Sequence, residues 1–154
     1  MKARAIAGGV ELVLDPEEAG FVRSLPDYLD GLGDDQDDPA VRRLTPIIHP
    51  DDDDASAEFD RFVGPALADE RREDRDLVAT AIQAGTTRLT TEEAEAVLRV
   101  VGEVRLALAA RHGLLDDPGG SMPEPSASSP RAQMVIHHLG WMMEQITEAL
   151  VAGL

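Results

Sequence analysis

The chain has 154 residues, of which 43% are hydrophobic and only 3% aromatic, and its 30 acidic and 14 basic side chains give a formal net charge of −16. This length suits one ordinary domain, and a core with so few rings must be packed from Ala, Val, Leu and Ile, which favours closely packed helices. The negative charge makes nucleic acid and membrane surfaces unexpected partners, and the lack of cysteine excludes disulfides, thiolate zinc sites and a cysteine nucleophile.

Residues 2–14 are expected to form a β-hairpin. Gly8 and Gly9 supply the pair of positive φ angles that a tight turn requires. Alternate residues from Val10 to Leu14 are apolar, with Glu11 between them, which indicates one buried and one exposed face. Because an isolated hairpin is only marginally stable, this hairpin should lie on the helices.

A helical body is expected over residues 15–113. Its first helix begins at Asp15, followed by a proline and two acidic residues that suit a helix start. Pro26 lacks the N–H that a helix interior needs, so a kink or a break is expected there. A second short helix is predicted from the cap Asp38-Pro39 to Leu44.

The middle of the chain is predicted to be helical from about Asp54, with an interruption at Gly64-Pro65. The apolar residues of this part recur at helical spacing: Ala55, Phe59, Phe62, Val63 and Leu67. Residues 69–76 are almost all charged, which is typical of a solvated helix segment with partners four residues apart. Gly85 is expected to end this helix.

The clearest helix begins at the capping box of Thr90 and Glu93 and closes at Gly113. Residues 114–130 are rich in Pro, Gly and Ser and are expected to form a mobile loop before a last helix at 130–152. The residues expected to be buried along this last helix are Met134, Ile136, Leu139, Trp141, Met142, Ile146, Ala149 and Leu150. The predicted fold is mainly α, a single domain over residues 1–154 that consists of a bundle of about four main helices with a short N-terminal β-hairpin.

One group of candidate metal ligands lies in the connector before the middle helices. His49 precedes an acidic run that includes Asp51 and Asp53, and carboxylate oxygens suit calcium or magnesium. The run lacks the calcium-loop pattern of alternating Asp and Asn followed by glycine. The preferred interpretation is therefore a solvated charge run that serves the start of the next helix.

A second candidate group consists of His137 and His138 with Glu144, all in the last helix. Adjacent histidines point about 100° apart on a helix, so they cannot chelate one ion as a pair four residues apart would. The preferred interpretation is one packed and one exposed histidine.

Arg105 stands between two apolar residues on or near the buried side of the clearest helix. Its guanidinium must extend to solvent or find a carboxylate on another helix, so a buried ion pair is predicted, with an anion site for a ligand as the alternative. No nucleophile elbow and no glycine-rich phosphate loop is present. The sequence therefore predicts no catalytic residue and no cofactor.

Four stretches cover most of the chain outside the Pro-rich loop: GGVELVLDPEEAGFVRSL, DPAVRRLTPIIHPDDDDASAEFDRF, TTEEAEAVLRVVGEVRLALAARHGL and HHLGWMMEQITEALV. Together they resemble a bacterial, chiefly actinobacterial, family known as domain of unknown function two thousand seventeen. The chain departs from it at Thr45, where an aromatic residue is expected. The resemblance implies a mostly helical fold, the bacterial cytosol, no catalytic residues to carry over and, through genes near a Clp-protease adaptor, a link to proteostasis.

The leading functional hypothesis is a cytoplasmic, non-enzymatic protein-interaction or regulatory module that binds a protein partner with a basic surface. The alternative is a divalent-metal-binding protein or metal-dependent enzyme that uses the histidines and carboxylates named above. A transcriptional regulator is third, because such a protein needs a basic patch that this sequence lacks. The broad apolar arc of the last helix also predicts a homodimer through that helix.

Overall fold

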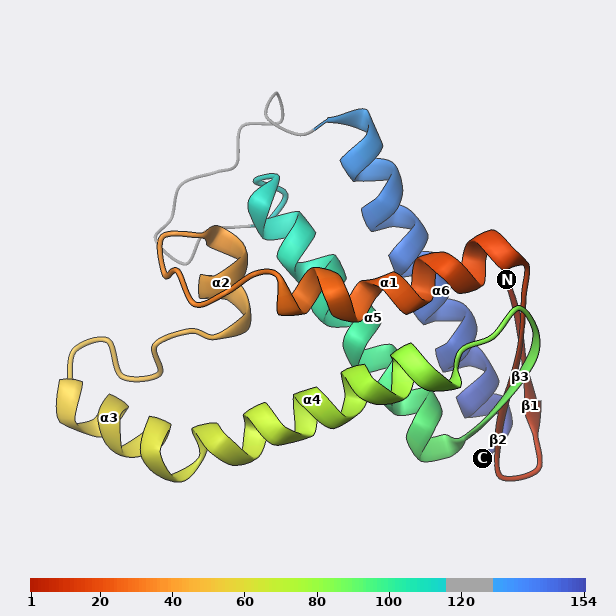
Figure 1. Cartoon of the computed structure of the whole chain (residues 1–154), viewed down its shortest axis with the longest axis horizontal. Helices are drawn as coiled ribbons and strands as arrows, with labels where there is room; N and C mark the ends of the chain where they lie inside the picture. The colour runs from red at the N-terminus through yellow and green to blue at the C-terminus, as the bar shows by residue number, and fades with distance from the viewer. Residues whose placement is uncertain (116–128) are drawn as a thin grey trace.

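The computed structural model describes residues 1–115 and 129–154, so most of the loop expected at 114–130 lies outside the described residues. Its elements are β1 (Lys2–Ile6), β2 (Gly9–Leu14), α1 (Pro16–Asp30), α2 (Pro39–Leu44), α3 (Asp53–Phe62), α4 (Gly64–Ala81), β3 (Gly85–Thr90), α5 (Thr91–Arg111) and α6 (Pro130–Ala152). The mainly helical fold is confirmed, with six helices in the described residues instead of about four, and a small sheet lies at one end of the molecule (Figure 1). In the described part of the chain, no helix combines the length and apolarity needed to cross a membrane.

The N-terminal hairpin is present, but a third strand extends it into a sheet. β2 is the central strand and pairs antiparallel with β1 on one side and with β3 on the other. β3 was not predicted from the sequence, because Gly85 was expected only to end a helix. Thr87 and Leu89 are buried and alternate with exposed residues, which is the pattern of a half-buried strand.

The two glycines of the hairpin turn have different roles. Gly8 has a φ of 77°, as expected for a tight turn, whereas Gly9 does not have a positive φ and already belongs to β2. A Cβ atom on Gly9 would lie only 1.9 Å from the carbonyl oxygen of Leu89. Position 9 therefore needs glycine because the backbones of β2 and β3 approach closely, and not because of its φ angle.

Replacing Gly9 with Ala is expected to lower the free energy of unfolding by about 2 kcal/mol, because the backbone of β2 or β3 must move to admit the methyl group. Gly20→Ala is the matched control, since a Cβ atom in that part of α1 meets nothing within 4 Å. Alanine is the better helix former by about 1 kcal/mol, so the control should be at least as stable as the wild type. Urea unfolding of both variants measures the difference, and wild-type stability of Gly9→Ala would contradict the close approach.

Glu11 is buried, although the strand pattern placed it on the exposed face. It lies in register with Arg4 of β1 and Arg88 of β3. The Nε atoms of the two arginines donate to its carboxylate at 2.6 Å and 3.1 Å, respectively. The hydrogen bond from Arg88 is the main cause that lowers the pKa of Glu11. The flanking guanidinium groups thus cover a carboxylate that a lone strand would leave in water.

α5 forms the centre of the helical body and packs against α1, α2, α4 and α6 (Figure 1). Its valines at 97, 100, 101 and 104 are almost completely buried. Leu12 of the sheet and Leu139 and Ile146 of α6 belong to the same core cluster. None of the fully buried side chains in the described residues is aromatic, so the predicted aliphatic core is confirmed.

α1 continues through Pro26 to Asp30 as one helix, so of the kink or break predicted at this proline, the break is wrong. A proline inside a helix removes one backbone hydrogen bond. Leu25 and Leu29, on either side of Pro26, are both only 3% exposed. The burial of these neighbours in the core stabilises the helix enough to offset the lost bond.

α6 has the predicted bounds, but its buried face is narrower than expected. Leu139, Met142 and Ile146 are buried, whereas Met134 is 69% and Trp141 is 37% exposed. α6 packs mainly against α5 and β1. These two elements cover only one side of the helix, so part of its broad apolar arc remains in contact with solvent.

Candidate functional site

The acidic run before α3 forms a helix start. His49, Asp51 and Asp53 are all exposed, and Asp52 accepts a hydrogen bond from the backbone N–H of Ala55 at 3.0 Å as the cap of α3. In residues 1–115 and 129–154, no three His, Asp or Glu side chains are grouped so that they could hold a metal ion. The described geometry therefore offers the metal-binding alternative no support.

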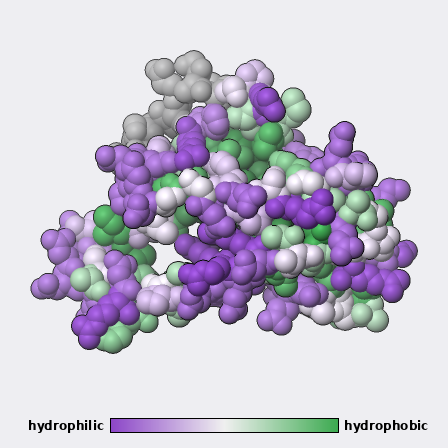
Figure 2. Space-filling model, in the orientation of Figure 1, coloured by the Kyte–Doolittle hydropathy of each residue, from purple (hydrophilic) through white to green (hydrophobic). Residues whose placement is uncertain are grey.

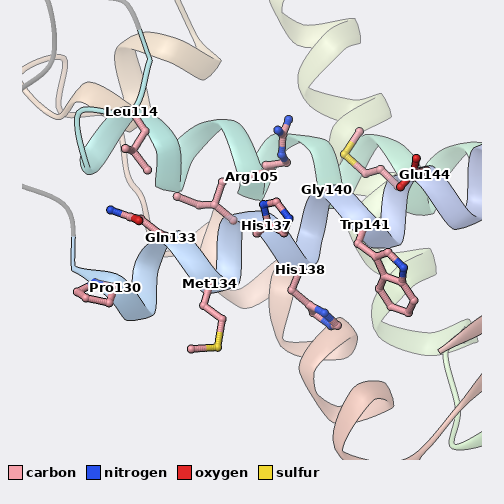
Figure 3. Close-up of a pocket in the computed structure, with 12 residues that line it drawn as sticks. Arg105, Leu114, Pro130, Gln133, Met134, His137, His138, Gly140, Trp141 and Glu144 are labelled. Atoms are coloured by element: carbon pink, nitrogen blue, oxygen red, sulfur yellow. The ribbon is translucent and has the colours of Figure 1, made fainter. Parts of the chain in front are cut away.

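The two histidines of α6 have different surroundings. His137 is exposed, whereas His138 is half-buried and its ring stacks on Trp141 with 5.5 Å between ring centroids. Figure 3 shows the two imidazoles leaving the helix in different directions, as expected for neighbours in a helix. Glu144 is exposed further along α6.

An open groove of about 1250 Å³ runs along the outer side of α6 beside α5 (Figure 3). It is lined by Arg105, Leu114, Pro130, Gln133, Met134, Ile136, His137, His138, Gly140, Trp141, Met143 and Glu144. The Nε atom of Arg105 lies 3.2 Å from the position that a Cβ atom on Gly140 would occupy. Glycine at 140 therefore lets the guanidinium lie against the backbone of α6. Because the structure contains one copy of the chain, a homodimer through this helix stays a prediction.

Arg105 is exposed and forms no ion pair with the other described residues, so the predicted buried ion pair at this position is wrong for the described part of the chain. The corresponding pair is made by Arg99, on an earlier turn of α5. Arg99 donates two hydrogen bonds to Asp74 of α4, at 2.7 Å and 2.8 Å, and Asp74 is only 8% exposed. This bidentate contact raises the pKa of Arg99.

The charged segment 69–76 makes contacts that the sequence analysis did not predict. It was expected to be solvated and to pair within α4, but Arg75 pairs with Asp30 of α1 at 2.8 Å. Arg71 pairs with Glu103 of α5 at 3.0 Å. These ion pairs, together with that of Asp74, join α4 to two other helices. Sequence spacing alone could not predict these ion pairs, because the two residues of each pair lie far apart in the chain.

Apolar side chains gather on the surface around α3. We call Ile47, Ile48, Phe62, Val63 and Leu67 the α3 apolar face; their exposed fractions are 60%, 46%, 64%, 40% and 42%, respectively. α3 itself has no buried residue, and its main neighbour is α4. Ala55 and Phe59 of α3 are half-buried, whereas Phe62 at its end is left largely uncovered by the described residues. Figure 2 shows apolar patches among strongly hydrophilic surface at the end of the molecule where Figure 1 places α3.

The surroundings of the α3 apolar face are strongly anionic. Residues 47–67 contain six carboxylates and a single arginine. That arginine, Arg61, lies with its guanidinium carbon 4.9 Å from the ring centroid of Phe62. The helical spacing of Phe62, Val63 and Leu67 could be predicted from the sequence, but their exposure could not. An amphipathic pattern shows that one side is apolar, and it does not show whether the same chain covers that side.

The N-cap residue of α2, Asp38, also forms an ion pair with the end of α5. Asp38 caps α2 by accepting from the backbone N–H of Ala40 at 2.8 Å. It also accepts from Arg111 at the end of α5, where the distance from Nε to Oδ1 is 3.2 Å. The hydrogen bond from Arg111 is the main cause that lowers the pKa of Asp38 below its ordinary value of 3.8.

Replacing Asp38 with Asn is expected to lower the free energy of unfolding at pH 7 by about 0.5 to 1 kcal/mol, because asparagine keeps the cap but not the ion pair with the partly exposed Arg111. Since the pKa of Asp38 is lower in the folded state, its carboxylate stabilises the fold fully above the unfolded value of 3.8. The difference between variant and wild type should disappear as the pH falls through the lowered value. Denaturation at several pH values measures this, with Asp37→Asn, exposed and outside this pair, as the control. A difference that persists unchanged at the lowest pH would contradict the assignment.

The comparison with protein families gives one match. The family model described as a domain of unknown function (DUF2017) matches residues 1–150, which is nearly the whole chain. No curated protein and no solved structure matches the chain significantly. The chain therefore belongs to the DUF2017 family, as the resemblance of its four stretches predicts.

Proposed function

We propose that this protein is a non-enzymatic interaction or regulatory module, and that it inserts the α3 apolar face into an apolar groove on a partner protein whose rim carries Lys and Arg. The observation that carries the proposal is α3 itself, an amphipathic helix of 10 residues without a single buried residue. Binding of an amphipathic helix in a groove is a common mode of peptide recognition.

The α3 apolar face supplies side chains of the kind that anchor such a helix. Burying a fully exposed Phe or Ile side chain contributes about 1.5 to 3 kcal/mol. Phe62 and Ile47 are 64% and 60% exposed, so most of this contribution remains to be gained on binding. Monomeric proteins seldom expose several large apolar side chains together without an interaction that covers them.

The charge around this face supports a basic rim on the partner. Asp51 to Asp54 lie at the N-terminal end of α3, and Glu58 and Asp60 are exposed along it. Such a field attracts a positively charged surface, speeds its association and disfavours acidic partners. The attraction is screened by salt, so the association rate should fall as ionic strength rises.

The proposed setting is the bacterial cytosol. The family resemblance supports this compartment and also suggests proteostasis as the process. If the partner is a component of the proteolytic machinery, the interaction belongs to proteostasis.

Site-specific photo-crosslinking in the native cell tests the proposal. A photoreactive phenylalanine analogue replaces Phe62 in one strain and Glu92, an exposed residue at the start of α5, in the control strain. We expect a specific adduct from position 62 and none from position 92. The crosslinked residue on the partner, mapped by mass spectrometry, should lie in an apolar groove beside Lys or Arg.

Two results would contradict the proposal: equal adducts from both positions, or a crosslinked surface on the partner that lacks basic residues. An adduct from position 62 to a second copy of this chain would show that the face is a dimer contact. Light scattering of the purified protein distinguishes that outcome, because a dimer doubles the mass.

A further inference from the structure

A second pocket, of about 390 Å³, lies where the end of α1, the short α2 and the middle of α4 meet. Three arginines of α4 line it, Arg71, Arg72 and Arg75, and Asp30 is the only acidic residue among the described residues of its lining. The whole chain has 30 acidic and 14 basic side chains. Three arginines around one pocket are thus unusual for this acidic protein, and each of them is paired with a carboxylate, which is Asp30, Asp69 or Glu103.

Arg75 has a donor that the fold does not satisfy. Its Nη1 donates to Asp30 at 2.8 Å, and its Nη2 makes a long contact of 3.4 Å with Glu103. Its Nε atom is buried and has no hydrogen-bond partner among the described residues. A buried donor without an acceptor is destabilising, so Arg75 would gain from a partner for its Nε atom.

Glu103 accounts for the poor geometry at Arg75, because it is shared between two arginines. Its Oε1 pairs with the Nε of Arg71 at 3.0 Å, while Oε2 makes the long contact with Arg75. If another anion took the place of Glu103 at Arg71, the carboxylate of Glu103 could pair side-on with Arg75 through both Nε and Nη2. Side-on pairs of this kind are the strongest that arginine makes.

Arg72 is the most accessible of the three cations. Its side chain is 67% exposed, and within the described part of the chain it pairs with Asp69 alone, which is 66% exposed, at 2.8 Å. An exposed pair of this kind contributes little stability and is easily exchanged for another anion. Arg72 can therefore present its guanidinium donors to a ligand at the cost of this exposed pair, whereas at Arg71 the ligand takes the place of Glu103. Arg71 keeps the hydrogen bond from its Nη2 to the carbonyl oxygen of Leu44 at 3.1 Å.

The other walls of the pocket are apolar. Leu29, Leu32, Val41 and Leu44 line the pocket together with the arginines. A ligand that fits both walls has a compact negative group and a short apolar part, which is how small-molecule sites combine a few polar groups with an apolar lining.

We infer that this pocket binds a small oxyanion, a carboxylate or a phosphate, that carries a short apolar chain. The oxyanion contacts Arg71 and Arg72, the chain lies against the leucines, and Glu103 turns fully to Arg75. The inference is independent of the proposed docking function, because it rests on a different set of residues.

NMR spectroscopy of the arginine Nε–Hε groups of the full chain tests it, with hexyl phosphate, hexanoate and inorganic phosphate as probes. We expect saturable shifts of the Arg71, Arg72 and Arg75 signals with a probe that has a hexyl chain, and binding at least ten-fold weaker for inorganic phosphate. Comparison of hexyl phosphate with hexanoate shows which oxyanion the site prefers.

Arg72→Gln should weaken the binding of the preferred probe at least ten-fold while the variant stays folded, because the exposed pair with Asp69 is the only one lost. Arg23→Gln, a change of an exposed arginine of α1 outside the pocket, should bind like the wild type. Weak, unsaturable shifts of all arginines alike, or equal binding by the two variants, would overturn the inference and leave the arginines as a purely structural ion-pair network. If inorganic phosphate binds as tightly as the hexyl probes, the leucines do not contribute to binding, and this part of the inference is overturned.

Discussion

Replacing Leu139 with Ala is expected to lower the free energy of unfolding by about 3 kcal/mol, since removing a fully buried leucine side chain leaves a cavity in the core. Leu139 is 0% exposed and belongs to the cluster that joins α6 to the sheet and α5. Urea denaturation followed by circular dichroism gives the value.

Met134→Ala is the matched control for this prediction, because it shortens an apolar side chain on the same helix. Met134 is 69% exposed. Its loss should change the free energy of unfolding by no more than about 0.5 kcal/mol, as for most surface changes. Equal losses for the two variants would mean that α6 faces the core with a different side from the one described.

Replacing Phe62 with Asp is expected to weaken the binding of the partner captured through α3 at least thirty-fold, because central aromatic anchors of an interface contribute about 2 kcal/mol or more. The introduced carboxylate would also have to be buried in an apolar groove. The stability of the free protein should hardly change, since Phe62 is 64% exposed. Isothermal titration calorimetry with the purified partner measures the affinity.

Val151→Asp is the control for this second prediction. Val151 is an apolar residue near the end of α6 that is 62% exposed, so the change adds the same charge to a comparable surface away from α3. It should leave the affinity within about two-fold of the wild-type value, since a distant surface charge acts only through a screened field. Equal effects of both variants would indicate that overall charge, and not the α3 apolar face, determines binding.

The parts of the fold that follow local rules could be predicted from the sequence. The cap at Asp38 and the capping box of Thr90 and Glu93 form as predicted, because each depends on residues within one helical turn. β3 was missed for the opposite reason. Its backbone bonds come from β2, far away in the chain, and its six residues lie between two helices with strong signals of their own.

Which polar and apolar groups are buried could not be predicted where it depends on distant partners. Glu11 is buried only because arginines of both neighbouring strands cover it. Trp141 looks like a core residue by its spacing, yet it is 37% exposed because α5 and β1 cover another side of α6. In both cases the deciding contacts join segments that the sequence alone does not place side by side.

The candidate sites also depend on contacts between distant segments, so the sequence alone could not predict them. The histidines and aspartates that attracted attention as metal ligands do not come together in the described residues. The exposed face around Phe62 and the pocket of Arg71, Arg72 and Arg75 became visible only with the helices in place. Charge and helical spacing identified the segments that carry these features, but not the surfaces that they form.

Hydrogen–deuterium exchange of the free protein and of its complex with the captured partner tests the docking role of α3 most directly. We predict slower exchange in the partner complex over residues 47–67 and no change along the groove side of α6. Slower exchange along α6, with residues 47–67 unchanged, would contradict the account.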